Sequence, residues 1–273
     1  MAVASAAAVL EALEGEALEA EALPAPGRGN CELLVGEGAM DKLLDELVNR
    51  LKNAYGQDLV SVVLFGSAAA GEFHEKFSDV NVLCVLKSID LRDLEKGEEA
   101  VGWWLKQKQP LPLFLSRGEV ETSQDVFPIE FIDIQHNHRV LYGEDVVAKI
   151  EVKTQQHRRQ VEHEIRSRLL RLRERYLGLQ RNKKEVSRLM LDSLPSFSTL
   201  FRHILILGGV EAPLKKREIF RAAAERFSIA AEPFMTLLET REGKRKLADD
   251  EVKPLFQAYL TEITRMTAAV DKL

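Results

Sequence analysis

The sequence has 273 residues, enough for one large domain or two of modest size, and its hydrophobic fraction of 45% is that of an ordinary globular protein. A formal net charge of -5 argues against a protein that coats nucleic acid, so no DNA partner is expected. No apolar run approaches the roughly 20 residues of a membrane helix. The two cysteines, Cys31 and Cys84, suggest no disulfide framework or zinc site. A cytoplasmic protein without a membrane partner is therefore expected.

The first 30 residues are rich in alanine and glutamate and run into a stretch of proline and glycine. They contain few large side chains that could bury a helix face, so we predict a disordered acidic tail over residues 1–30. Helical spacing of leucines then predicts an amphipathic helix over Met40–Tyr55, which Gly56 ends.

Two apolar segments follow, Leu59–Phe65 and Val80–Leu86, and both read as strands covered on both faces. A Gly66-Ser67 turn and a short helix of small residues are predicted between them. Glycine permits a tight turn and the close approach of a ligand, while the start of the helix offers free N–H groups. With the hydroxyl of Ser67, this turn suits a phosphate chain.

Asp79 and Asn81 stand two residues apart at the start of the second strand, so their side chains leave on the same face. Such a pair of oxygen ligands beside a phosphate site could hold a hard cation such as Mg²⁺. A later strand that carries Glu130 would complete the cluster. The alternative is structural: Asp79 caps the strand, Asn81 binds in a turn and Glu130 lies at an edge.

Between the second strand and residue 147 the pattern predicts alternating short elements. A helix is expected over Leu91–Lys106, where Trp103 and Trp104 are either core residues or a base-stacking surface. The remaining expectations are a short strand at Leu111–Leu115, helical turns over Arg117–Gln124, a third strong strand at Phe127–Gln135 and a helical turn over His136–Tyr142.

Strand patterns vanish from about Thr154, and a helical bundle domain is predicted over residues 153–273. The expected helices cover Gln155–Gln180, Lys184–Leu207 with Pro195 kinking or splitting it, a segment after Pro213, Glu232–Thr240 and Val252–Val270. The first is rich in arginine. It is either a solvated, salt-bridged helix or a basic wall that contacts triphosphate or an RNA backbone.

Gly66-Ser67, followed after eleven residues by Asp79-Val80-Asn81-Val82, resembles the signature of the DNA polymerase β-like nucleotidyltransferase superfamily. In layout the chain is similar to small bacterial members such as antibiotic nucleotidyltransferases of the kanamycin type. The resemblance implies an α/β (α+β) fold: a small mixed-sheet nucleotidyltransferase domain over residues 40–147, followed by an all-helical bundle.

The resemblance also implies a chemistry. In the family, strand carboxylates hold Mg²⁺ ions that position a nucleoside triphosphate, and an acceptor hydroxyl takes the nucleoside monophosphate as pyrophosphate leaves. Carried over by position, Asp79 and Glu130 are the catalytic and metal-binding carboxylates, with Asp133 as the second choice to Glu130. Gly66 and Ser67 bind the nucleotide. The acceptor, a small molecule, a protein or an RNA end, is not indicated.

This sequence departs from the family pattern in two ways. Asn81 stands at a carboxylate position, which weakens the metal site, and Ala68-Ala69-Ala70 replaces basic residues that would contact phosphate. An active transferase and a non-catalytic, nucleotide-binding or antitoxin-like interaction protein are therefore both open. Arg158 and His163 also match the Arg-x-x-x-x-His pattern of helical HEPN ribonucleases, a match that arises easily in such a helix.

Overall fold

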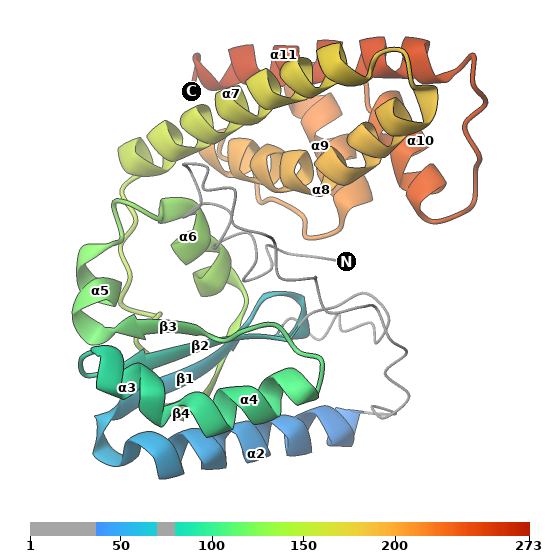
Figure 1. Cartoon of the computed structure of the whole chain (residues 1–273). Helices are drawn as coiled ribbons and strands as arrows, with labels where there is room; N and C mark the ends of the chain where they lie inside the picture. The colour runs from blue at the N-terminus through green and yellow to red at the C-terminus, as the bar shows by residue number, and fades with distance from the viewer. Residues whose placement is uncertain (1–36, 70–79) are drawn as a thin grey trace. The chain divides into compact units, whose positions relative to one another are not determined.

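The computed structural model describes residues 37–69 and 80–273 (Figure 1). The chain divides into two units, one that ends at Val152 and one over Lys153–Leu273. The acidic tail predicted for residues 1–30 lies outside the described residues. Within the described ranges, no helix is long and apolar enough to cross a membrane.

A four-stranded mixed sheet forms the centre of the first unit. Its strands are β1 (Leu59–Phe65), β2 (Asn81–Leu86), β3 (Leu113–Ser116) and β4 (His138–Gly143), in the order β3-β2-β1-β4. β1 pairs antiparallel with β2 and with β4, and β3 runs parallel to β2. The two predicted apolar segments are thus the two central strands.

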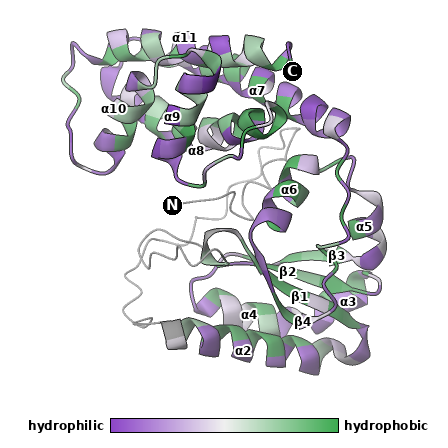
Figure 2. Cartoon of the chain, turned by 180° about the vertical axis from the view of Figure 1, so that it is seen from behind, coloured by the Kyte–Doolittle hydropathy of each residue, from purple (hydrophilic) through white to green (hydrophobic). Residues whose placement is uncertain are grey.

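Both faces of the sheet are covered, as the continuous apolar strands predicted. Alternate residues such as Val62 and Cys84 join a core with α2 (Glu37–Tyr55) and α4 (Glu98–Lys106). The intervening residues, such as Val63 and Leu83, join a second core with α5 (Arg117–Thr122) and α6 (Pro128–His136). Figures 1 and 2 show the hydrophobic strands enclosed between these two layers of helices. The period of two along each strand places neighbouring side chains in different cores.

The single helix expected over Leu91–Lys106 is two helices, α3 (Leu91–Lys96) and α4, which meet at Gly97. Asp90 caps α3 in a capping box with Asp93. A Cβ atom at Gly97 would lie 2.2 Å from Oη of Tyr55. A side chain at position 97 would have to displace the Tyr55 hydroxyl, so glycine suits the junction of α3 and α4 against the end of α2.

The two adjacent tryptophans of α4 differ in their surroundings. Trp104 is fully buried in the core with α2, and its Nε1 donates a hydrogen bond to the carbonyl oxygen of Pro110 at 2.7 Å. Trp103 is half-buried, with the guanidinium of Arg50 4.8 Å from its ring centre. Trp104 is therefore a core residue, and only Trp103 presents its ring at the surface.

We expect Trp104→Phe to lower the free energy of unfolding by about 1–3 kcal/mol, because it shrinks a filled core site and leaves the Pro110 carbonyl without its donor. Trp103→Phe, the matched control one residue away, should cost less than about 1 kcal/mol. Urea unfolding followed by far-UV circular dichroism measures both. Equal losses would contradict the different surroundings of the two rings.

The prediction of a strand over Phe127–Gln135 is wrong, because this segment is the helix α6 (Pro128–His136). Pro128 occupies the first turn, where a missing N–H costs nothing. Phe131 and Ile134, three residues apart, pack on the sheet from one side of the helix. The helical turn expected over His136–Tyr142 is also wrong, since β4 occupies most of it.

The second unit is entirely helical among its described elements. Its helices are α7 (Thr154–Leu179), α8 (Lys183–Leu207), α9 (Lys216–Phe227), α10 (Glu232–Arg241) and α11 (Val252–Val270). α8 contacts the other four and carries more buried side chains than any one of them. It continues through Pro195 as one helix, so the proline does not split it.

Aromatic rings join α8 to three of these neighbours. Phe234 of α10 stacks on Phe220 at 4.4 Å between ring centres and meets Phe201 and Tyr259 edge-on at 5.2 and 5.5 Å. All four side chains are buried. The predicted fold class, a mixed α+β domain followed by a helical domain, is confirmed by the described structure.

Candidate functional site

The turn after β1 has the backbone that the sequence predicted for a glycine. Gly66 adopts a φ of 81°, in the left-handed region where a side chain is strained. Its N–H donates to the carbonyl oxygen of Asn137 at 2.9 Å, and its own carbonyl accepts from the N–H of Ala69 at 3.0 Å. The turn is thus held between the end of α6 and the short 3-10 helix Gly66–Ala68. The side chain of Ser67 lies outside the described part of the structure.

Asn81 opens β2 directly beside this turn. It pairs with Phe65, the residue before Gly66, and its side chain is only 2% exposed. Since Phe65 and Leu83 both belong to the core with α6, the alternation along β2 places the Asn81 side chain on that same face. Asp79 lies outside the described residues. The described structure thus brings Gly66 and Asn81 together at one end of the central strands.

Glu130 and Asp133 lie on α6, which covers that face of the sheet. Glu130 is half-buried in the first turn of the helix, and Asp133 is 4% exposed. On a strand they would have pointed in different directions, but three residues apart on a helix they are neighbours. The helix end at His136 adjoins the Gly66 turn, and Asp133 is about 4.5 Å along the axis from it, against about 9 Å for Glu130.

The strands themselves supply no acidic ligand. β1 to β4 as described contain neither Asp nor Glu. Leu83 of β2 pairs with Leu113 of β3, so the position beside Asn81 on that side falls near Leu111. Among residues 37–69 and 80–273, no group of three or more acidic, histidine or cysteine side chains is placed to hold a metal ion.

One polar pair at this end of the sheet was missed by sequence reasoning. His138 begins β4 opposite Phe65, in line with Asn81 across the sheet. Its Nδ1 lies 3.1 Å from the carbonyl oxygen of Gln135, and its Nε2 lies 3.3 Å from a carboxylate oxygen of Asp145. The signal was hidden because the segment was expected to be helical, and a helix would not have aligned His138 with β1.

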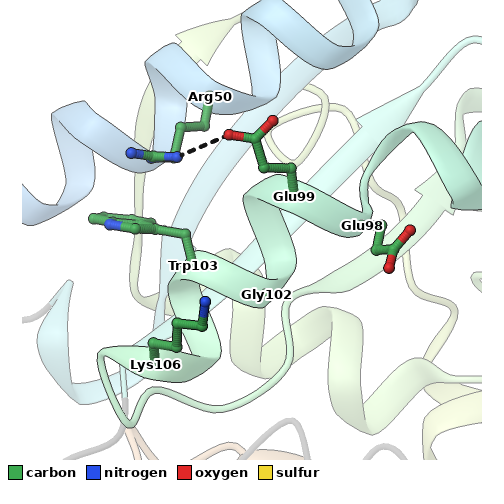
Figure 3. A pocket seen from close by; sticks show the side chains of 6 residues that line it. All are labelled: Arg50, Glu98, Glu99, Gly102, Trp103 and Lys106. Carbon is green, nitrogen blue, oxygen red and sulfur yellow. Dashed lines mark hydrogen bonds and ion pairs between the residues drawn. The ribbon is translucent and has the colours of Figure 1, made fainter.

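A hollow of about 510 Å³ lies elsewhere in this unit, between α2 and α4. Figure 3 shows its lining, with Trp103 and Lys106 beside the ion pair of Arg50 and Glu99. Arg50 also binds Glu46 at 2.8 Å. None of the predicted metal-binding or phosphate-binding residues lines this hollow, and its arginine is already neutralised, so we do not assign the site to it.

The arginines of α7 are in part neutralised, as the salt-bridged reading predicted. Arg166 pairs with Glu162 at 3.1 Å, and Arg168 pairs with Glu164 at 3.3 Å. Arg158 donates to the carbonyl oxygens of Val270 and Asp271, each at 3.4 Å. His163 is exposed five residues further on, about 140° away around the helix. Arg158 and His163 therefore do not point at a common substrate position.

Comparison with known proteins agrees with this arrangement. A family model for the nucleotidyltransferase domain matches residues 44–166, which include the whole sheet and α6. This part of the chain is therefore a nucleotidyltransferase domain, and the resemblance to the DNA polymerase β-like superfamily is confirmed.

Two individual proteins are similar. One from Methanocaldococcus jannaschii, named "Putative protein adenylyltransferase MJ1305", is 37% identical over 60 residues, which are 22% of this chain and 40% of that protein. The second is a crystal structure of spectinomycin adenyltransferase AAD(9) from Enterococcus faecialis with ATP and spectinomycin. It superposes with a TM-score of 0.52 at 13% identity, over 84% of this chain and 98% of that one. At this identity the match shows the fold.

Proposed function

We propose that the chain transfers a nucleoside monophosphate from a nucleoside triphosphate to an acceptor hydroxyl. ATP is the donor that we favour, because both similar proteins are named for adenylyl transfer. The observation that carries the proposal is the left-handed Gly66 turn beside the buried Asn81, at the end of two antiparallel strands. Within this turn the N–H groups of Gly66 and Ala69 bond to main-chain oxygens, so we infer that the phosphate chain meets the N–H groups of Ser67 and Ala68.

In the proposed transfer, one bond to phosphorus forms as another breaks. The acceptor oxygen forms a bond to the α-phosphorus, the bond from that phosphorus to the β-phosphate oxygen breaks, and pyrophosphate leaves while the hydroxyl proton passes to solvent. Gly66 and Ser67 bind and orient the triphosphate. The acceptor, which the described residues do not identify, is a small molecule, a protein or an RNA end.

The oxygen donors at this end of the sheet fit a hard cation such as Mg²⁺. Asn81 would hold it from the start of β2, together with Asp79, which precedes that strand in the sequence, and Glu130 or Asp133 would approach from α6. When bound, the cation stabilises negative charge on the phosphate oxygens. An amide at position 81 brings no negative charge, so we infer a weaker site than three carboxylates would make.

The same facts favour a second candidate, a nucleotide-binding protein with little or no catalysis. Its specific support is the absence of any carboxylate from the four described strands. Both candidates predict nucleotide binding, and they differ only in turnover.

Transfer from α-labelled ATP in the presence of Mg²⁺, over a panel of small-molecule, protein and RNA acceptors, tests the first candidate. We expect a labelled product and pyrophosphate above the level of an Asp79→Ala control, which should lose about a thousandfold in rate if a metal-binding carboxylate is removed. Binding of ATP by the unmodified chain without any product above that control would favour the second candidate. Absence of ATP binding would contradict both.

A further inference from the structure

The start of α9, in the helical unit, leaves its backbone donors open. Its first main-chain hydrogen bond runs from the N–H of Ile219 to the carbonyl oxygen of Lys215 at 2.9 Å. Lys215 is the N-cap residue and provides no side-chain cap. Among the described residues, no acceptor faces the N–H groups of Lys216, Arg217 and Glu218. A helix start of this kind attracts anions.

Lys216, at the first position of α9, is a buried cation at this same helix start. Its side chain is 9% exposed, and within the described structure it has no hydrogen bond or ion pair. Helical side chains tilt toward the N-terminal end, so the Lys216 side chain leaves α9 toward the end that carries the open N–H groups. Burial, and then the nearby positive charge of Arg241, lower the pKa of Lys216 to about 8. Both effects oppose the charged form, which a bound anion would favour.

Arg241 ends α10 and brings a second positive group to this place. One of its terminal nitrogens donates to the carbonyl oxygen of Leu191 at 3.2 Å, which leaves the other donors of the guanidinium available among the described contacts. Two neighbouring cations at the positive end of a helix repel each other, and the arrangement is unfavourable unless a negative group lies between them.

Three acidic side chains near the start of α9 pair with other cations. Glu218 lies 4.0 Å from Lys215, Glu242 lies 2.8 Å from Arg217, and Glu239 lies 3.9 Å from Arg217. Burial and the positive charge of Arg241 are the causes of the lowered pKa of Lys216, and no carboxylate contributes to it. The protein therefore supplies the positive groups of an anion site and leaves the negative one to a ligand.

We propose that Lys216, Arg241 and the first N–H groups of α9 form a binding site for a phosphate group. A tetrahedral oxyanion matches the three kinds of donor: backbone amides, an ammonium and a guanidinium. The phosphate is either free or the terminal phosphomonoester of a larger molecule. The site is separate in the sequence from the Gly66 turn, and the proposal does not depend on nucleotidyl transfer.

The test measures binding of inorganic phosphate to the full chain by calorimetry, without divalent cations and against chloride of matched ionic strength. Lys216→Met keeps the apolar stem and removes the charge. We expect it to weaken binding about tenfold or more, and Arg241→Gln to act in the same direction. Lys215→Met is the matched control, because Lys215 is the exposed neighbour that already faces Glu218. It should leave binding nearly unchanged.

The pH dependence gives a second readout. With sulfate, whose charge is constant over the range, affinity should be level below about pH 8 and fall above it as Lys216 loses its proton. The Lys216→Met variant should lack this fall. Removing a buried charge is not expected to unfold the helix, and thermal unfolding of the variant verifies that.

Three results would overturn the proposal: no binding at millimolar phosphate, equal affinity in the chain and in Lys216→Met, or equal losses in Lys216→Met and Lys215→Met. The same titration with glycerol phosphate tells whether the site prefers free phosphate or a phosphomonoester. Binding tighter than that of inorganic phosphate assigns the site to phosphomonoesters, and weaker binding assigns it to the free ion.

Discussion

Replacing Asn81 with aspartate is expected to tighten Mg²⁺ binding at the nucleotidyltransferase domain by about tenfold or more. The side chains are nearly equal in size, but the carboxylate adds a negative charge next to the proposed cation position, in a place that is 2% exposed to solvent. Titration of the chain with Mg²⁺, or with Mn²⁺ as a spectroscopic probe, in the presence of ATP measures the change.

The same variant has an opposite effect without metal. An extra buried carboxylate with no cation should lower the free energy of unfolding by about 1–3 kcal/mol, and saturating Mg²⁺ should restore it. Asn182→Asp is the matched control, since it makes the same amide-to-acid change at the N-cap of α8. It should leave the affinity for Mg²⁺ unchanged. An unchanged affinity in Asn81→Asp as well would place Asn81 away from the cation.

Gly143→Ala is expected to destabilise the first unit by about 3 kcal/mol or more. Gly143 ends β4 with a φ of 80°, and a Cβ atom there would lie 2.0 Å from the carbonyl oxygen of Val60. Because this oxygen is backbone and accepts from the N–H of Glu144 at 3.2 Å, it cannot move aside without disturbing the pairing of β1 with β4.

Gly56→Ala separates the strain of a positive φ from the steric clash with Val60. Gly56 also has a positive φ, 52°, but nothing lies within 4 Å of the added Cβ. Gly56→Ala should therefore lower the free energy of unfolding only by its conformational strain, about 1 kcal/mol. Both tryptophans of the chain lie in the first unit, so their fluorescence during urea unfolding reports on this unit alone. Equal losses in the two variants would show that the close contact at Gly143 is relieved without cost.

Sequence reasoning located best the elements whose residue pattern fits only one kind of secondary structure. β1 occupies the predicted Leu59–Phe65, and β2 differs from Val80–Leu86 by one residue. Runs of buried β-branched residues ended by glycine or by polar residues suit a strand covered on both sides. The end of α2 at Tyr55, before Gly56, follows from the same kind of boundary signal.

The misread segment was ambiguous for a physical reason. Nine residues that are apolar on more than one side can be a buried strand or a short buried helix, and periodicity does not separate them. Pro128 was the available signal for a helix start. The error carried into the site, because it assigned Glu130 and Asp133 to opposite faces of a strand and concealed the alignment of His138 with β1. Gly66 and Asn81, by contrast, lie side by side as their spacing suggested.

The pairing of β1 also has a consequence during synthesis. One edge of β1 pairs with β2, which leaves the ribosome soon after β1. The other edge pairs with β4, whose residues begin only at His138. At usual rates of translation the interval is on the order of 10 s. Throughout it, a central strand of the sheet offers unpaired backbone groups along an apolar surface, the feature by which nascent chains associate. The nucleotidyltransferase domain is therefore most exposed to aggregation before β4 emerges.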